Sequence, residues 1–272
     1  MNTFWERKMI GAIIGDIVGS IYEWNNIKTK EFEFFRPKCI PTDDSIMSLA
    51  VAKALLECGG DYTDLGEKTV YYMQTIGRNY PDCGYGFRFE NWIFSNNPKP
   101  YGSYGNGAGM RVSACGFVAR SLEEAIELSK KVTEITHNHP EGLKGAEAVA
   151  VAIYLARTGS TIEEIREYIE KNYYSLDFTL DSIRDTYKFN ETCQDTVPQA
   201  IVAFLESTDF EDAIRNAISI GGDSDTLACI TGGIAEAYWG VPEEIKAKAI
   251  TYLDEDLFRI LAKFENQYDS LD

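Results

Sequence analysis

The sequence contains only two histidines, His137 and His139, and its six cysteines are scattered without a C-x-x-C pair. With no third histidine and no neighbouring cysteine, the two histidines do not make a zinc site. Cysteines at such spacing are typical of reduced residues in a hydrophobic core. This cysteine usage indicates a reducing compartment, and we expect a cytoplasmic protein.

Positive charge is also scarce. Lys and Arg number 26 against 43 Asp and Glu, which gives a formal net charge of −17. Such a surface disfavours non-specific binding to nucleic acid and to anionic membranes. An anionic ligand would need a local site of backbone N–H groups, a few basic side chains or a cation. Apolar stretches are interrupted before they reach membrane-spanning length, and the N-terminus lacks the layout of a signal peptide.

Strand and linker signals are missing as well. No N-G or D-G turn lies between alternating segments, and there is no repeat of fixed period, no low-complexity tract and no Pro/Ser linker. Helical periodicity is present along most of the chain. It predicts a single all-α domain, residues 1–272. Two further helices are expected to begin at the capping-box patterns Ser121/Glu124 and Thr161/Glu164, and a last one at residue 254. The other expected helices cover residues 10–21, 42–58, 63–78, 110–120, 143–157, 197–205, 210–220, 224–238 and 242–252.

Two segments stand outside this pattern. Residues 28–35 alternate in the manner of a strand or an extended loop. Residues 80–109 are rich in Gly, Pro, Asn and Tyr, and we expect a long loop with one turn around residues 89–95.

The first predicted helix carries glycine at every fourth position, Gly11, Gly15 and Gly19. One side of the helix is therefore nearly bare, which predicts a close contact with another helix. Asp16 and Glu23 are seven residues apart and would share a helix face, offset by about 20°. This face could be solvated, but Asp16 interrupts an apolar helix, where a buried carboxylate needs a partner.

Two acidic clusters precede apolar helices far apart in the chain. Either cluster alone is explained by helix capping, for which Asp, Ser and Thr are favoured. A cap needs one side chain, however, whereas each cluster offers two carboxylates and two hydroxyls. Four carboxylates in one place would repel one another unless cations lay between them, and oxygen ligands suit Mg²⁺ or Mn²⁺. The clusters are Thr42, Asp43, Asp44 and Ser45, and Asp223, Ser224, Asp225 and Thr226, the second preceded by Gly221 and Gly222.

A glycine-rich segment, residues 101–107, stands just before the helix expected at residue 110. Exposed backbone N–H groups next to a helix N-terminus can bind a diphosphate, and Arg111 could add a charged contact. Its tyrosines could line or stack on an aromatic base. A flexible surface loop is the alternative, and His137 has a comparable alternative as a helix cap or polar turn.

Taken together and in this order, these motifs strongly resemble the ADP-ribosylglycohydrolase family, typified by the dinitrogenase-reductase-activating glycohydrolase. Any one motif is weak, but five in the same order are specific. The resemblance runs from residue 10 to about residue 239. The motifs are Gly15-Asp16 with Gly19 and Glu23, Thr42-Asp43-Asp44-Ser45, Gly102-Ser103-Tyr104-Gly105-Asn106-Gly107, Thr136-His137-Asn138 and Gly222-Asp223-Ser224-Asp225-Thr226.

The resemblance implies a compact orthogonal bundle of helices around a central site for two Mg²⁺ or Mn²⁺ ions. One ion would be bound by Thr42, Asp43, Asp44 and Asp225, and the other by Asp223, Asp225 and Thr226, so that Asp225 bridges them. ADP-ribose would be held by Gly102, Ser103, Tyr104, Gly105, Asn106 and His137.

The implied activity is metal-dependent hydrolysis of the glycosidic or ester bond between ADP-ribose and an acceptor. The acceptor would be an ADP-ribosylated protein side chain or a small ADP-ribosyl conjugate, and its chemistry stays open. Glu23 is the first candidate for the acid–base carboxylate. Asp82 is the second, because a carboxylate on a Gly/Pro loop can close over substrate, although a plain turn residue is the alternative.

Two other functions remain open. A non-catalytic ADP-ribose-binding or crystallin-like relative would keep the fold without turnover, although all the metal-ligand types are present here. A two-metal phosphoesterase would cleave the diphosphate and yield AMP and ribose phosphate. That chemistry usually recruits histidines, of which this chain has two.

Overall fold

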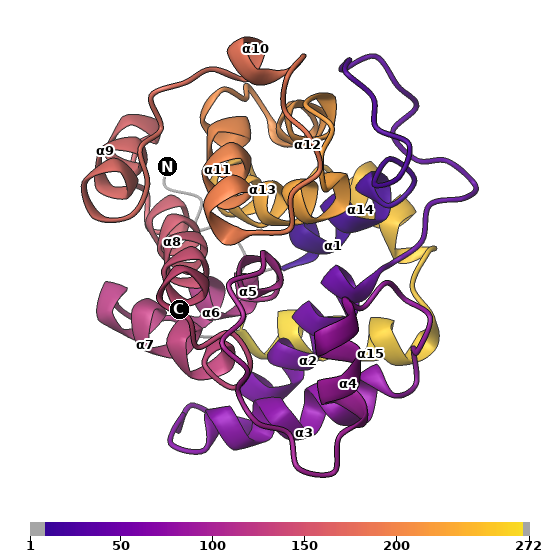
Figure 1. Ribbon diagram of the computed structural model, residues 1–272, viewed down its shortest axis with the longest axis vertical. Helices are drawn as coiled ribbons and strands as arrows, with labels where there is room; N and C mark the ends of the chain where they lie inside the picture. The colour runs from indigo at the N-terminus through magenta and orange to yellow at the C-terminus, as the bar shows by residue number, and fades with distance from the viewer. Residues whose placement is uncertain (1–8, 269–272) are drawn as a thin grey trace.

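The computed structural model describes residues 9–268. Within this range the regular structure is helical, no β-strand is present, and one isolated antiparallel bridge joins Gly105 and Thr192. The predicted all-α class is therefore confirmed (Figure 1). The elements are α1 (Ile10–Gly19), α2 (Asp43–Cys58), α3 (Leu65–Gly77), α4 (Phe87–Phe94), α5 (Gly107–Met110), α6 (Ser113–Val118), α7 (Leu122–Thr133), α8 (Pro140–Arg157), α9 (Ile162–Asn172), α10 (Leu180–Ile183), the 3₁₀ turn η1 (Cys193–Asp195), α11 (Val197–Leu205), α12 (Phe210–Ser219), α13 (Ser224–Trp239), α14 (Glu243–Ile250) and α15 (Glu255–Tyr268).

The glycines of α1 pack against α13, as the sequence predicts. A Cβ atom built on Gly15 would lie 1.9 Å from the carbonyl oxygen of Ala228, and one on Gly11 would lie 2.4 Å from that of Gly232. A Cβ atom built on Gly19 would lie 2.5 Å from the Cα atom of Asp225. Only glycine permits this approach, so the first helix and the helix after the second acidic cluster meet backbone to backbone.

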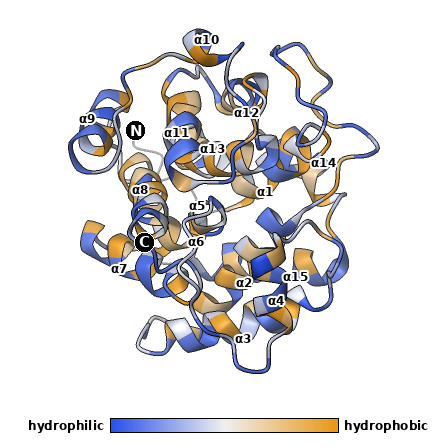
Figure 2. Cartoon of the chain, in the orientation of Figure 1, coloured by the Kyte–Doolittle hydropathy of each residue, from blue (hydrophilic) through white to orange (hydrophobic). Residues whose placement is uncertain are grey.

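The other helices surround this pair. In Figure 1, α1 and α13 lie in the middle of the view, with α11 and α12 on one side and α2 on the other. All ten residues of α1 are buried, whereas the peripheral α9 buries only Ile165 and Ile169. Figure 2 shows the matching hydropathy, with α9 alternating between hydrophilic and hydrophobic residues. The described residues include no helix with both the length and the apolar character needed to cross a membrane.

Several helices begin at the residues that the sequence indicates. The Thr42 side chain accepts from the amide of Asp44 and caps α2, and Thr161 and Glu164 form the full capping box of α9. Ser121 caps α7, but the Glu124 carboxylate accepts from the amide of Arg120 at 2.6 Å instead of that of Ser121. The predicted capping box at Ser121 is therefore only half formed.

Three local predictions are wrong. The first helix ends at Gly19 and a turn follows, so Glu23 does not share a helix face with Asp16. The helix expected over residues 110–120 is broken between α5 and α6, where the Arg111 side chain turns inward and becomes buried. Residues 87–94 form a helix instead of a single turn. For residues 28–35 the structure has the loop that was one of the two alternatives, with no strand.

Candidate active site

A cavity of about 480 Å³ opens where the motifs of the sequence converge. Its wall includes residues from both acidic clusters, from the glycine-rich segment and from the His137 turn. The residues proposed from the sequence that line it are Glu23, Asp43, Asp44, Ser103, Gly105, Asn106, His137, Asp223, Asp225 and Thr226. Four others, Thr42, Asp82, Gly102 and Tyr104, lie outside the wall.

The carboxylate of Asp16 connects α1 to the first acidic cluster. It is fully buried and accepts from the Thr42 amide at 2.8 Å and the Thr42 hydroxyl at 2.5 Å. The amide and hydroxyl of Ser45 also donate to it. Burial nevertheless raises the pKa of Asp16 to about 6. The buried Asp16 carboxylate is thus hydrogen-bonded to the N-terminus of α2, and the Thr42 hydroxyl points toward Asp16.

The carboxylates of the two clusters approach one another closely. Among residues 9–268, ligand-type oxygens of Asp16, Asp44 and Asp225 lie within 4.8 Å of one another, and so do those of Glu23, Asp223 and Asp225. Asp225 belongs to both groups, which is the position expected of a bridging ligand. Asp43 belongs to neither group, although it lines the cavity.

Electrostatic repulsion within this cluster is strong. Burial raises the pKa of Asp44 well above its usual range, and the charges of Asp16 and Asp43 raise it further. The pKa of Asp225 is also raised well above its usual range, first by burial and then by the charge of Asp223. Oδ1 of Asp44 is buried without a hydrogen-bond partner among the described residues, while Oδ2 accepts from the Thr226 hydroxyl at 3.2 Å. An unpartnered buried carboxylate oxygen surrounded by carboxylates fits a hard cation.

The second cluster is held by its two glycines and by Asn106. Gly221 and Gly222 have φ values of 65° and 81°, which other residues rarely adopt. The Asn106 amide group donates to Asp223 at 2.8 Å, which joins the glycine-rich segment to the acidic cluster. The diphosphate and metal motifs of the sequence are therefore parts of one cavity wall.

Glu23 reaches this wall from an irregular segment, residues 20–41, instead of from a helix. Asn26 fastens the segment to the second cluster, because its side chain donates to the carbonyl of Gly222 at 2.8 Å and accepts from the Gly222 amide at 2.7 Å. Lys28 donates to the carbonyls of Tyr187 and Ile220. These bonds fix the backbone on the C-terminal side of Glu23.

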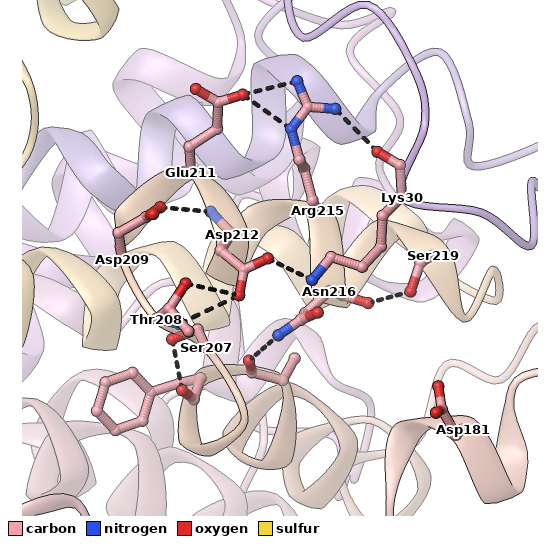
Figure 3. Close-up of polar contacts among 12 residues, drawn as sticks. Lys30, Asp181, Ser207, Thr208, Asp209, Glu211, Asp212, Arg215, Asn216 and Ser219 are labelled. Atoms are coloured by element: carbon pink, nitrogen blue, oxygen red, sulfur yellow. Dashed lines mark hydrogen bonds and ion pairs between the residues drawn. The ribbon is translucent and has the colours of Figure 1, made fainter.

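The far part of the same segment is fixed by α12 (Figure 3). Lys30 pairs with Asp212, and Arg215 donates to the carbonyl of Lys30 at 2.9 Å and to that of Phe32 at 2.8 Å. The guanidinium of Arg215 also lies 4.8 Å from the centroid of the Phe32 ring. The irregular segment of residues 20–41 is therefore fixed at several points.

The carboxyl group of Glu23 is half-buried beside the acidic clusters. Burial raises the pKa of Glu23 to about 7, and the charges of Asp223 and Asp16 add to the shift. A carboxyl group with a pKa near neutrality can both hold and release a proton at physiological pH.

The glycine-rich segment uses part of its backbone internally. The amide of Gly102 donates to Asn138 Oδ1, that of Gly105 to Ser103 Oγ and that of Asn106 to the Glu191 carbonyl. No hydrogen bond is formed within residues 9–268 by the amides of Ser103 and Gly107, whose residues line the cavity. The Tyr104 amide has no such bond either, but Tyr104 is outside the cavity wall, so the amides of Ser103 and Gly107 are the ones available to an anion in the cavity.

Arg111 and His137 close this end of the cavity. The buried guanidinium of Arg111 donates to the Thr136 hydroxyl at 2.6 Å, and Nδ1 of His137 lies 2.7 Å from the same oxygen. Burial, followed by the charge of Arg111, lowers the pKa of His137 well below its usual range. The imidazole is therefore neutral, and its Nε2 is 3.5 Å from the position of a Cβ on Gly107.

Asp82 is exposed, and its loop contacts the acidic cluster through backbone instead. The carbonyl of Cys83 accepts from the Asp43 amide at 3.1 Å, and Gly84, at φ 114°, approaches the Asp43 carboxylate. Sequence reasoning missed the cavity residues Tyr85, Arg88 and Glu191. Tyr85 follows Gly84 directly and Arg88 lies in the first turn of α4, so the Gly/Pro loop before them was a signal, whereas Glu191 had none.

Comparison with known proteins identifies the family of the chain. The family model of ADP-ribosylglycohydrolase matches residues 7–269. The chain is 26% identical to ADP-ribosylhydrolase ARH3 of Homo sapiens, over 92% of this chain and 90% of that protein. It is 25% identical to ADP-ribosylarginine hydrolase Tri1 of Pseudomonas putida, over 97% of this chain and 79% of that protein.

A solved structure described as an ADP-ribosylglycohydrolase-related protein complex has the same fold, with a TM-score of 0.70 and 22% identity over 97% of this chain and 98% of that one. The family match covers nearly the whole length of the sequence, including every motif that meets at the cavity. The chain therefore belongs to the ADP-ribosylglycohydrolase family and is a hydrolase.

Proposed function

We propose that this protein is a divalent-metal-dependent hydrolase that releases ADP-ribose from an acceptor and so reverses ADP-ribosylation. The observation that carries the proposal is the position of Asp225 in both carboxylate groups, in the same cavity as the free amides of Ser103 and Gly107. A metal cluster and an anion site side by side suit a substrate with a ribose at one end and a diphosphate next to it.

Two Mg²⁺ or Mn²⁺ ions would be held by the acidic clusters. Asp43, Asp44 and Asp225, with Thr42, would hold one, and Asp223, Asp225 and Thr226 the other. The unpartnered Oδ1 of Asp44 and the raised pKa values of Asp44 and Asp225 support this donor set. When bound, such ions orient ribose hydroxyls and make a water molecule more acidic. Asp16 would position Thr42 and Ser45 by the hydrogen bonds described above.

The diphosphate would lie against residues 102–106 and the start of α5. Backbone N–H groups at Ser103 and Gly107 can donate to phosphate oxygens, as can a neutral His137 if Nε2 carries the proton. Tyr104 stands at the edge of this segment, 5.1 Å from the His139 ring, and is exposed. Its ring would contact the part of the nucleotide that extends out of the cavity.

Glu23 would supply the acid–base function. Its half-buried carboxyl group lies beside Asp223 and Asp225, at the end of the cavity where the ribose would be. A proton held on Glu23 could pass to the leaving group, and the carboxylate could then take a proton from the attacking water. Asp82 is the second candidate only if its loop moves, because it lies outside the cavity wall.

The acceptor would be an ADP-ribosylated protein side chain or a small ADP-ribosyl conjugate. The names of the relatives differ on this point, since one is an ADP-ribosylarginine hydrolase. All six cysteines are free, which supports a reducing, cytoplasmic location.

The experiment is a panel of ADP-ribosyl conjugates linked through arginine, serine or an acetyl ester, incubated with the protein and Mg²⁺ or Mn²⁺. We expect free ADP-ribose from at least one conjugate, and none after treatment with a chelator. Formation of AMP and ribose phosphate would identify a phosphoesterase. Tight binding of ADP-ribose with no turnover of any conjugate would identify a non-catalytic relative.

A further inference from the structure

Two exposed aromatic side chains line the cavity, and a third stacks on one of them. Trp24 and Phe87 line it and are 73% and 79% exposed, which makes them the two most exposed large hydrophobic residues of the described chain. Phe189, also exposed, stacks on Trp24 with 5.0 Å between ring centroids. Single exposed apolar residues are ordinary, but three at the entrance of one cavity indicate a binding surface.

These three residues come from separate segments that the fold brings together. Trp24 follows Glu23 in the segment fastened by Asn26, Phe87 begins α4, and Phe189 lies in the loop between α10 and η1. Tyr187, in the same loop as Phe189, accepts from Lys28 and donates to the carbonyl of Asp195 at 2.5 Å. Trp24 and Phe189 therefore project from segments that are held in place.

The position of this surface relative to the carboxylates limits what can occupy it. Asp44 and Asp225 are 2% and 3% exposed, so the acceptor of a bound conjugate has room only on the solvent side of the cavity. Trp24 lines the same cavity and is largely exposed, so it lies on that side. An acceptor larger than a single amino acid would extend over the aromatic surface.

The charges around the surface select the kind of acceptor. Glu23 precedes Trp24, Glu191 is exposed two residues after Phe189, and both line the cavity. Of the cations nearby, Arg88 is engaged with the Tyr101 carbonyl and ring, and Lys188, which precedes Phe189, is exposed. With a net charge of −17, the chain would repel a nucleic-acid acceptor and attract a basic polypeptide.

We propose that Trp24, Phe87 and Phe189 form a docking surface for the polypeptide that carries the ADP-ribosylated residue, and that this polypeptide is basic around the modification. The inference rests on the proposed function. Apolar side chains and the aliphatic stems of Lys and Arg would pack on the rings, while their charged ends face Glu191.

The test compares two substrates with the same linkage: a peptide with lysines flanking the ADP-ribosylated residue, and the ADP-ribosylated free amino acid. Phe87→Ala and Phe189→Ala are each compared with Tyr71→Ala, which removes a 60% exposed aromatic ring from α3, outside the cavity wall. We expect each of the first two to lower kcat/KM for the peptide by roughly three- to tenfold through KM. Turnover of the amino-acid conjugate and the Kd of ADP-ribose should not change in Phe189→Ala, because Phe189 is outside the cavity wall, and Tyr71→Ala should match the parent throughout.

An equal loss on both substrates, or weaker binding of ADP-ribose, would mean that the rings contact the nucleotide and would overturn the docking surface. Unchanged peptide kinetics would overturn it as well. Equal kcat/KM for a peptide with glutamates in place of the lysines would overturn the basic partner, and faster cleavage from an ADP-ribosylated oligonucleotide would replace the polypeptide with nucleic acid. Failure to release ADP-ribose from either conjugate would instead reject the proposed function itself.

Discussion

The hydroxyl of Thr42 donates to Oδ1 of Asp16 over 2.5 Å, while the amide of Thr42 donates to Oδ2 of the same carboxylate. Asp16 lies in the middle of α1, and Thr42 is the N-cap of α2. These two hydrogen bonds therefore fix the position of the first acidic cluster relative to the second.

Replacing Asp16 by alanine should destabilise the protein strongly. The amides of Thr42 and Ser45 would be left buried without an acceptor, each at a cost of about 1–3 kcal/mol. Asp16→Asn keeps one carboxamide oxygen for these amides and should lose much less. Urea unfolding curves of both variants measure the difference, and equal losses would argue against the hydrogen-bonding role of the carboxylate.

Asp225→Asn should impair metal binding more than Asp223→Asn does. Asp225 belongs to both carboxylate groups, whereas Asp223 belongs to one. Calorimetric titration with Mn²⁺ should show two weakened sites in the first variant and mainly one in the second. Loss of the same single site in both would contradict the bridging assignment of Asp225.

Glu23→Gln should fold normally, bind ADP-ribose and turn over slowly. Glutamine keeps the shape of the side chain but cannot exchange a proton at neutral pH, so kcat should fall by about 10²–10⁴-fold with little change in ligand affinity. Single-turnover kinetics on the best conjugate measure this. If turnover stayed near that of the parent, the proton would have to be handled by metal-bound water or by Asp82.

Gly15→Ala should be among the most destabilising single changes. The new Cβ would lie 1.9 Å from the Ala228 carbonyl oxygen, so α1 and α13 would have to separate. We expect a loss of about 3 kcal/mol or more, beyond ordinary overpacking. Gly66→Ala is the matched control, because it is also helical and its Cβ would find its nearest atom at 3.6 Å. That change should be neutral or stabilise by up to about 1 kcal/mol.

Glu236 should make stability depend on pH. Its carboxyl group is buried at the end of α13, accepts from the Gly11 amide at 2.6 Å, and has Glu265 and Lys246 nearby. Burial raises the pKa of Glu236 from a usual 4.5 to about 8. The hydrogen bond from the Gly11 amide lowers this pKa somewhat, and the charge of Glu265 raises it.

The folded protein thus keeps a proton on Glu236 that the unfolded chain loses above pH 4.5. The favourable contribution is complete below that pH and declines as pH rises toward 8, by at most about 1.4 kcal/mol per unit. Glu236→Gln carries no such proton. The unfolding free energy of the parent, measured with Mn²⁺ present, should therefore fall relative to the variant between pH 5 and pH 8. Parallel curves would mean that Glu236 titrates normally.

The sequence was most informative where a residue has one local physical role. The glycine spacing of α1 predicted a close helix contact because nothing else explains a bare face, and Thr42 and Thr161 marked helix starts because caps are local. The helix end at Gly19 and the break at Arg111 were missed, since both follow from tertiary contacts. The segment that carries Glu23 is held at the cavity by hydrogen bonds between Asn26 and Gly222, which are 196 residues apart. No local sequence pattern predicts such a contact.

The contact between α1 and α13 also has a consequence during protein synthesis. α1 buries every residue, yet its main partner begins about 200 residues later in the chain. At usual translation rates the first helix waits roughly 10–40 s before α13 has been made. During that time the apolar residues of α1 lack the helix against which they pack in the folded protein, and the nascent chain depends on chaperones or transient contacts. A product truncated before α13 would lack both the cover for α1 and the second carboxylate cluster, so incomplete chains would aggregate instead of hydrolysing substrate.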